Sequence, residues 1–163
     1  MGWYSFFNDF QTAIVGTLGF LGVMATLWQN ASLARGVEEE RIKSVKLSAK
    51  KAAIEELKFF KRIYENGIEG MRPDADQSLM VPRIKRVVTT DMMPEIALLD
   101  GQDAHVAIDA LLTIDEIDRS LTLIATAVNE QYFTISAGAF ETLQGMYSGR
   151  LDKLKGALQK LEQ

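Results

Sequence analysis

The run FQTAIVGTLGFLGVMATLW, residues 10–28, contains no charged residue over 19 positions. A helix rises about 1.5 Å per residue, so this run would be roughly 28 Å long, close to the hydrocarbon thickness of a bilayer. Aromatic residues crowd its start and a tryptophan ends it, and such rings prefer the two membrane interfaces. The run predicts a transmembrane helix over residues 10–30, after an outer interfacial segment over residues 1–9. The residues expected to anchor it at the interfaces are Trp3, Tyr4, Trp28 and Arg35.

A buried core helix and a cleaved signal peptide are the other interpretations of this run. A core helix in so small a protein would rarely be apolar on every side. A signal peptide needs a basic region before its apolar segment, and none of the first ten residues is basic, although residues 32–34 resemble a cleavage site. Gly2 does not complete an N-myristoylation signal, because Phe6 stands where Ser or Thr is required.

Lys and Arg are distributed unequally on the two sides of the run. None precedes it, whereas Arg35 and Arg41 and then several lysines follow it. Membrane proteins retain Lys-rich and Arg-rich flanks in the cytoplasm. We therefore expect a single-pass protein of the bacterial inner (cytoplasmic) membrane, with the N-terminus outside and the C-terminal part in the cytoplasm.

Three glycines, Gly16, Gly19 and Gly22, recur at every third position of the run. Small residues let helix backbones approach closely in lipid, so this face favours helix–helix packing in the membrane. Glycine is also common in membrane helices generally, and the spacing alone does not decide between the two explanations. The expected partners are the lipid bilayer and either another copy of the chain or a larger membrane complex.

The rest of the chain is highly charged. It carries all 18 basic residues and 21 of the 22 acidic ones, since only Asp9 lies before Arg35. A net charge of -4 gives no reason to expect nucleic acid as a partner. The absence of cysteine excludes disulfides, thiol catalysis and thiolate metal sites.

Apolar residues at spacings of three and four predict an all-α fold for residues 31–163. A long helix over residues 33–66 leads into a loop at 67–82, and a small antiparallel helical bundle follows. Its expected helices are about residues 83–99, 102–131 and 136–161.

Two local features refine this expectation. Asp91 is predicted as the N-cap of a helix that begins at Met92, with Pro94 tolerated in the first turn. Residues 132–136 have the composition of a strand, but no partner strand is evident. We therefore expect a turn or a continued helix there.

The segments TLWQNA (residues 26–31), LAR (33–35) and KAAIEEL (51–57) give the chain a resemblance to a loose group of small bacterial single-pass membrane proteins. The resemblance spans about residues 10–120. It implies an N-terminal transmembrane helix and a cytoplasmic helical domain, and it carries no activity and no functional residue.

Two clusters of polar residues contain side-chain types that can support metal binding or acid–base chemistry. His105, the single histidine, lies one helical turn before Asp109, but a metal site needs three or more converging ligands. Asp115, Glu116 and Asp118 form an acidic cluster on an amphipathic helix, where most of them should face water. We assign no catalytic, cofactor-binding or metal residue, and no small-molecule substrate is evident.

These patterns favour a non-enzymatic, membrane-anchored helical interaction or scaffold protein. The alternative is a small oligomeric membrane effector or pore subunit, in which the glycine-faced helices assemble and the cytoplasmic bundle senses a signal.

Overall fold

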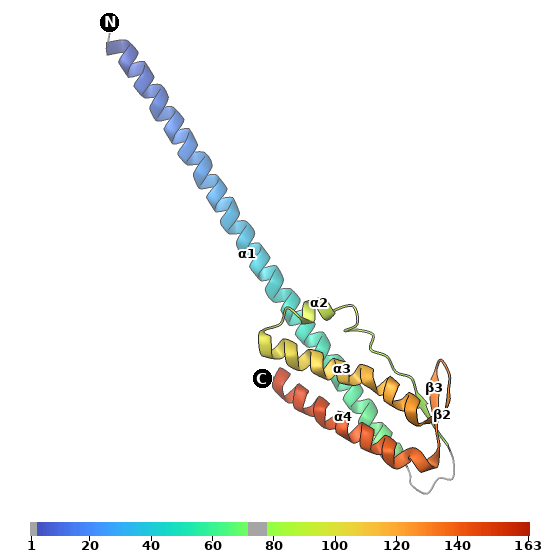
Figure 1. Cartoon of the computed structure of the whole chain (residues 1–163). Helices are drawn as coiled ribbons and strands as arrows, with labels where there is room; N and C mark the ends of the chain where they lie inside the picture. Colours follow the sequence, from blue (N-terminus) through green and yellow to red (C-terminus); the bar gives the residue numbers. More distant parts are fainter. Residues whose placement is uncertain (1–2, 72–77) are drawn as a thin grey trace. The chain divides into compact units, whose positions relative to one another are not determined.

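The computed structural model describes residues 3–71 and 78–163, and the side chains of residues 17–71 and 78–163. Its elements are shown in Figure 1 and run in the order α1 (Trp3–Gly70), β1 (Leu79–Pro82), α2 (Met93–Ile96), α3 (Gly101–Ile124), β2 (Ala125–Val128), β3 (Tyr132–Ile135), η1 (Ala137–Ala139) and α4 (Phe140–Leu161). The chain divides into two compact units, Met1–Ser44 and Val45–Gln163, which are described separately.

The first unit consists of the N-terminal part of α1. No proline interrupts it, and every described side chain from Thr17 to Ser44 is exposed. Two bonds within the helix satisfy polar groups on this surface. The Thr26 hydroxyl donates to the carbonyl of Gly22 at 2.9 Å, and the Arg41 guanidinium pairs with the Glu38 carboxylate at 2.8 Å.

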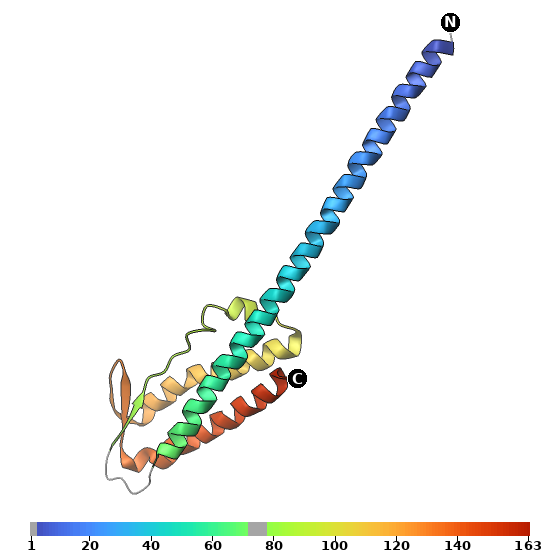
Figure 2. The same cartoon turned by 180° about the vertical axis from the view of Figure 1, so that it is seen from behind.

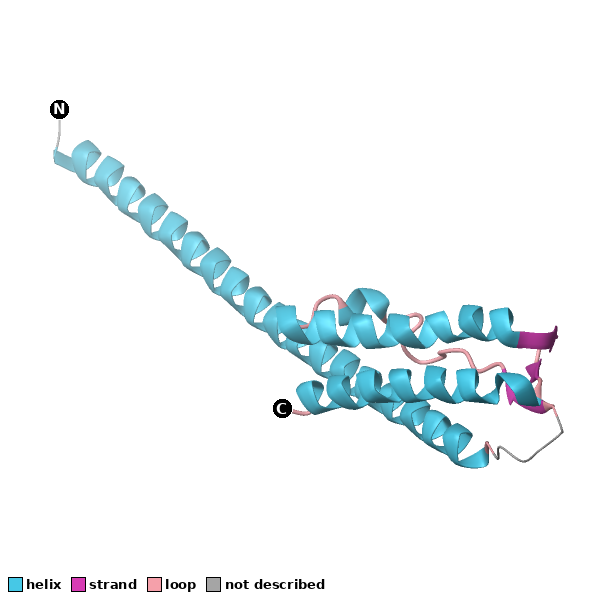
Figure 3. Cartoon of the chain, turned by 60° about the horizontal axis from the view of Figure 1, so that its bottom comes forward, coloured by secondary structure: helices cyan, strands magenta, loops and turns pink. Residues whose placement is uncertain are grey.

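The second unit contains three long helical segments: residues 45–70 of α1, α3 and α4. The chain reverses between α3 and α4 through β2 and β3, so these two helices run antiparallel and lie side by side (Figures 1 and 2). Figure 3 shows the strands gathered at the end of the unit where α3 finishes and α4 begins. This arrangement confirms the expected small helical bundle.

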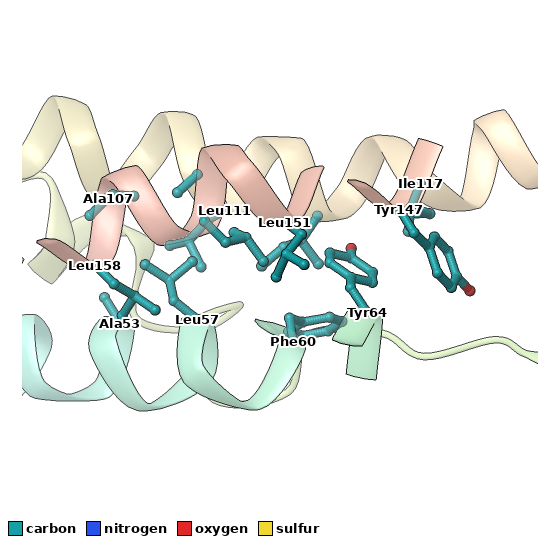
Figure 4. Close-up of a cluster of buried hydrophobic side chains, with 14 of the residues drawn as sticks. Ala53, Leu57, Phe60, Tyr64, Ala107, Leu111, Ile117, Tyr147, Leu151 and Leu158 are labelled. Carbon is teal, nitrogen blue, oxygen red and sulfur yellow. The ribbon is translucent and has the colours of Figure 1, made fainter. Parts of the chain in front are cut away.

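The apolar stripes of the three segments meet in one core. In α4 the seven apolar residues spaced three and four apart are all buried: Phe140, Leu143, Tyr147, Leu151, Leu154, Leu158 and Leu161. In α1 the stripe is buried from Ala49 onward, whereas Ile42 is 38% exposed. Figure 4 shows how the stripes interlock. Its labelled core residues are Ala53, Leu57, Phe60, Tyr64, Ala107, Leu111, Ile117, Tyr147, Leu151 and Leu158.

The expected all-α class is wrong in one respect, because the described residues include a three-stranded antiparallel sheet of order β1-β3-β2. β3 is the central strand, and Phe133 and Ile135 on it are buried against the helices. Val81 pairs with Phe133, and Val128 pairs with Phe133 from the other side. The strand-like composition of residues 132–136 was therefore a correct signal. The segment pairs with two strands, one of them about 50 residues earlier in the chain.

The helix expected at residues 102–131 is shorter than predicted. α3 ends at Ile124, and the chain continues directly as β2. Val128 fits the helical stripe by spacing, but it is 47% exposed on an edge strand. The backbone groups of β2 form hydrogen bonds with β3 in place of the bonds that they would form within a longer α3. The last helix likewise starts later than residue 136, with η1 preceding α4.

The helix expected at residues 83–99 is largely absent. Residues 83–87 are not helical, and α2 covers only Met93–Ile96. The N-cap position is Met92 and no side chain caps the helix, so the assignment of Asp91 was wrong, while Pro94 does lie in the first turn. The amides of residues 87–89 bind a carboxylate of another helix, which prevents them from joining a local helix.

Candidate functional site

The apolar segment, residues 17–28, forms an exposed apolar surface of the described first unit. Its large side chains are 50–80% exposed. These residues are Leu18, Phe20, Leu21, Val23, Met24, Leu27 and Trp28. Each exposed apolar Å² costs about 25 cal/mol in water, so a helix apolar on all sides needs another medium or a partner.

The glycines expected to pack helices lie on this surface. A Cβ atom built on Gly19 or Gly22 would meet nothing within 4 Å. Of the expected anchors, Trp28 is 80% exposed and Arg35 is exposed. The side chains of Trp3, Tyr4 and Gly16 lie outside the described residues. Gly19 and Gly22 therefore offer an open backbone surface, and their role in helix packing stays a prediction.

Among the residues that the structure describes, none of the helices is both long and apolar enough to cross a membrane.

The second unit contains a different kind of candidate site, built around the connector, residues 83–92, which joins β1 to α2. Glu56 of α1 is only 6% exposed and its carboxylate faces the connector. It accepts hydrogen bonds from the amides of Val87 (2.8 Å), Val88 (3.1 Å) and Thr89 (2.8 Å), and from the Thr89 hydroxyl. Four donors thus converge on one buried carboxylate, and they fix the backbone of the connector.

These donors control the charge of Glu56. Burial raises the pKa of the Glu56 carboxyl group, but the hydrogen bonds from Thr89, Val87 and Val88 outweigh burial and lower the pKa overall. The group is therefore an anion at neutral pH and cannot serve as a proton donor there.

Two arginines attach the connector to α3. Arg86, whose side chain is 8% exposed, donates to the Asp115 carboxylate at 2.8 Å and to the Thr89 hydroxyl at 2.9 Å. Arg83 pairs with Asp118, and its guanidinium carbon lies 5.1 Å from the centre of the Phe133 ring. Asp115 and Asp118 share one face of α3 because they are three residues apart.

The three acidic residues 115, 116 and 118 therefore do not act as one cluster in the structure. Asp115 and Asp118 bind arginines, while Glu116 is exposed. Sequence reasoning missed these arginines and Glu56, since the partners lie between 29 and 35 residues apart. The available signal was the presence of Arg83 and Arg86 close together at the start of the helix expected at residues 83–99.

His105 and Asp109 line a shallow hollow between α3 and α4, together with Lys153 and Lys160. Gly156 and Ala157 also line this hollow. No group of three His, Asp or Glu side chains suited to a metal ion occurs among residues 17–71 and 78–163. The described structure adds no ligand to the two that the sequence supplies.

Comparisons with family models, curated proteins and solved structures gave no match for this chain. A function must therefore be argued from its own residues.

Proposed function

We propose that the chain is a membrane-anchored helical interaction protein without catalytic activity of its own, held in the bacterial inner membrane by residues 10–28 with its C-terminal unit in the cytoplasm. The observation that carries this proposal is the apolar segment, whose described side chains are exposed on all sides of α1. Residues 17–28 alone are shorter than the about 20 residues that a spanning helix needs. The anchor therefore includes residues 10–16.

The polar groups of the apolar segment are compatible with lipid. A hydroxyl group in a bilayer must find its hydrogen-bond acceptor within the protein. The Thr26 hydroxyl finds one in the carbonyl of Gly22, one helical turn earlier. The first basic residue, Arg35, comes seven residues after Trp28, and it supports retention of the following unit in the cytoplasm.

The charged groups of the second unit support a binding role more than a catalytic one. Glu56 and the largely buried side chain of Arg86 are both engaged in bonds that hold the connector in place. The connector in turn presents Val87 and Val88 at 78% and 54% exposure. A rigid loop with exposed aliphatic side chains is suited to contacts between proteins.

Membrane extraction tests the anchor with a matched pair of variants. Leu18→Lys with Leu21→Lys places two charges near the centre of residues 10–28, and their combined insertion cost is about 5–7 kcal/mol. Leu33→Lys with Val37→Lys adds the same charges to side chains that are equally exposed but lie beyond the run. We expect the wild-type chain and the second variant to resist alkaline carbonate extraction and to float with vesicles, and the first variant to be released.

The proposal fails if the wild-type chain is extracted into the soluble fraction. It also fails if both double variants stay in the membrane as firmly as the wild type. Circular dichroism of each variant in mild detergent should show an unchanged helix content, which excludes unfolding as the cause of release.

A further inference from the structure

The second unit contains an apolar pocket of about 360 Å³ where the end of α1, β1 and α4 meet. Ile63, Leu79, Val81 and Ile84 provide its aliphatic walls. None of the eleven lining residues is Asp, Glu, Lys, Arg or His. Its volume lies within the range of about 300–1,000 Å³ typical of small-molecule sites. An ion in such a pocket would find no counter-charge among the lining residues.

Two glycines of α1 shape the pocket. A Cβ atom on Gly67 would lie 2.5 Å from Cε2 of Tyr147, so only glycine lets the tyrosine ring pack this closely against the helix. A Cβ atom on Gly70, one turn later, would meet nothing within 4 Å. The first glycine thus positions an aromatic wall, and the second leaves one side of the pocket open.

Tyr147 also supplies a hydrogen-bonding group. Its ring centre lies 5.1 Å from that of Tyr64, while its hydroxyl points away from the packed cluster (Figure 4). Burial raises the pKa of Tyr147 to about 12, so the hydroxyl is uncharged at neutral pH. It makes no hydrogen bond to any residue that the structure describes. Asn66 adds an amide at the same pocket.

We propose that this pocket binds a small, uncharged, mainly aromatic molecule whose single polar group bonds to the Tyr147 hydroxyl, as a phenol would. The aliphatic walls and the tyrosine ring receive the apolar part of such a ligand. The volume accepts a ring with a short substituent. The proposal is independent of the membrane anchor, because it concerns residues of the second unit alone.

Photolabelling of the full chain in vesicles tests this binding. The probe is phenyl-trifluoromethyl-diazirine, a neutral aromatic compound, and labelled residues are located by mass spectrometry. We expect labelling of residues 63–71 and 79–84 that excess phenol suppresses at least about fivefold. Labelling of residues 10–28 by the same probe reports lipid exposure, so failure of the anchor and failure of the pocket give different patterns.

Gly70→Leu fills the pocket without a clash at its Cβ, and Gly145→Leu is the matched control. Both positions are exposed helical glycines with open space, but only Gly70 lines the pocket. We expect Gly70→Leu to lose most pocket labelling and Gly145→Leu to keep it. Equal labelling of the two variants, or no labelling of residues 63–71 and 79–84 in the wild type, would overturn the proposal.

Tyr147→Phe separates specific binding from simple partition into an apolar hollow. It keeps the aromatic wall and removes the hydroxyl. In the wild type, phenol should compete with the probe more strongly than toluene does, and the variant should lose this preference. A phenol preference that persists in Tyr147→Phe would contradict the proposed hydrogen bond.

Discussion

Glu56 is the residue on which the connector depends. Its buried carboxylate accepts four hydrogen bonds, three of them from successive backbone amides. Replacing it by glutamine turns one acceptor oxygen into a donor that faces other donors. Hydrogen bonds to charged groups contribute about 1.5–3 kcal/mol each, so Glu56→Gln should lower the free energy of unfolding by about 3 kcal/mol or more.

Urea denaturation of the full chain in mild detergent, followed by circular dichroism, measures this loss. Glu55→Gln is the matched control, since Glu55 is the neighbouring residue and its side chain is 63% exposed. We expect the control to unfold at the wild-type urea concentration. Equal midpoints for the two variants would contradict the role assigned to Glu56.

The same carboxylate predicts a dependence of stability on pH. The pKa of Glu56 is lower in the folded chain than its ordinary value of 4.5. A group of this kind stabilises the folded state fully at pH values above 4.5, and its contribution is lost as the pH falls below 4.5 towards the folded pKa. The urea midpoint of the wild type should therefore decrease on acidification from about pH 6 to pH 3 more than that of Glu56→Gln. Parallel decreases would show that other groups cause the acid sensitivity.

Among the elements, α4 is the one that the sequence predicts best. Its apolar stripe is fully buried, and Leu154 at its centre has no exposed surface. Removing this side chain leaves a cavity, so Leu154→Ala should destabilise the fold by about 2–5 kcal/mol. Leu123→Ala is the control, because Leu123 is 84% exposed on α3. Thermal unfolding should separate the two variants clearly, and similar melting temperatures would mean that the helix packs differently.

The sheet shows why strands were harder to predict than helices. A helical stripe is visible within a short window, because residues three and four apart share a face. β3 depends on partners at residues 79–82 and 125–128. Its own composition indicated a strand, but β1 lies far away in the sequence. The apolar spacing of α3 continues into β2, so this spacing predicts β2 as part of the helix. Strand pairing depends on segments that lie far apart in the sequence. The sequence of one strand alone does not show which segment it pairs with.

The connector was unpredictable for a related reason. Glu56 lies three residues after Ala53 and four before Phe60, so by spacing it shares the apolar face of α1. A carboxylate is tolerated there because the amides of residues 87–89, from a distant segment, replace its water. Asp115 and Asp118 were expected to face water like their neighbour Glu116. Their arginine partners come from a segment that the sequence suggested was helical. Because residues 83–90 were wrongly assigned to a helix, neither the shape of the connector nor its contacts with α1 and α3 could be predicted.

At the scale of the whole molecule, the open glycine face predicts association between copies of the chain. A Cβ atom added at Gly19 or Gly22 would meet nothing within 4 Å, so isoleucine at these positions brings no clash at its Cβ and should act on assembly through a partner. We expect crosslinking in native membranes to yield an oligomer that Gly19→Ile with Gly22→Ile weakens severalfold. Gly36→Ile, also in open space, should leave it unchanged. A monomeric wild type would exclude self-association, and equal crosslinking of all three chains would exclude the glycine face.

The pairing of β1 with β3 has a consequence for the order in which the protein is made. The ribosome finishes β1 at Pro82 and reaches β3 only at Tyr132, which is 132 − 82 = 50 residues later. At about 5–20 residues per second, this interval lasts roughly 3–10 s. Until it ends, Leu79 and Val81 have no strand to pair with and no Phe133 to cover them. Newly made chains therefore pass through a period of several seconds in which this segment is open to chaperones and to misassembly, although the finished strand is paired.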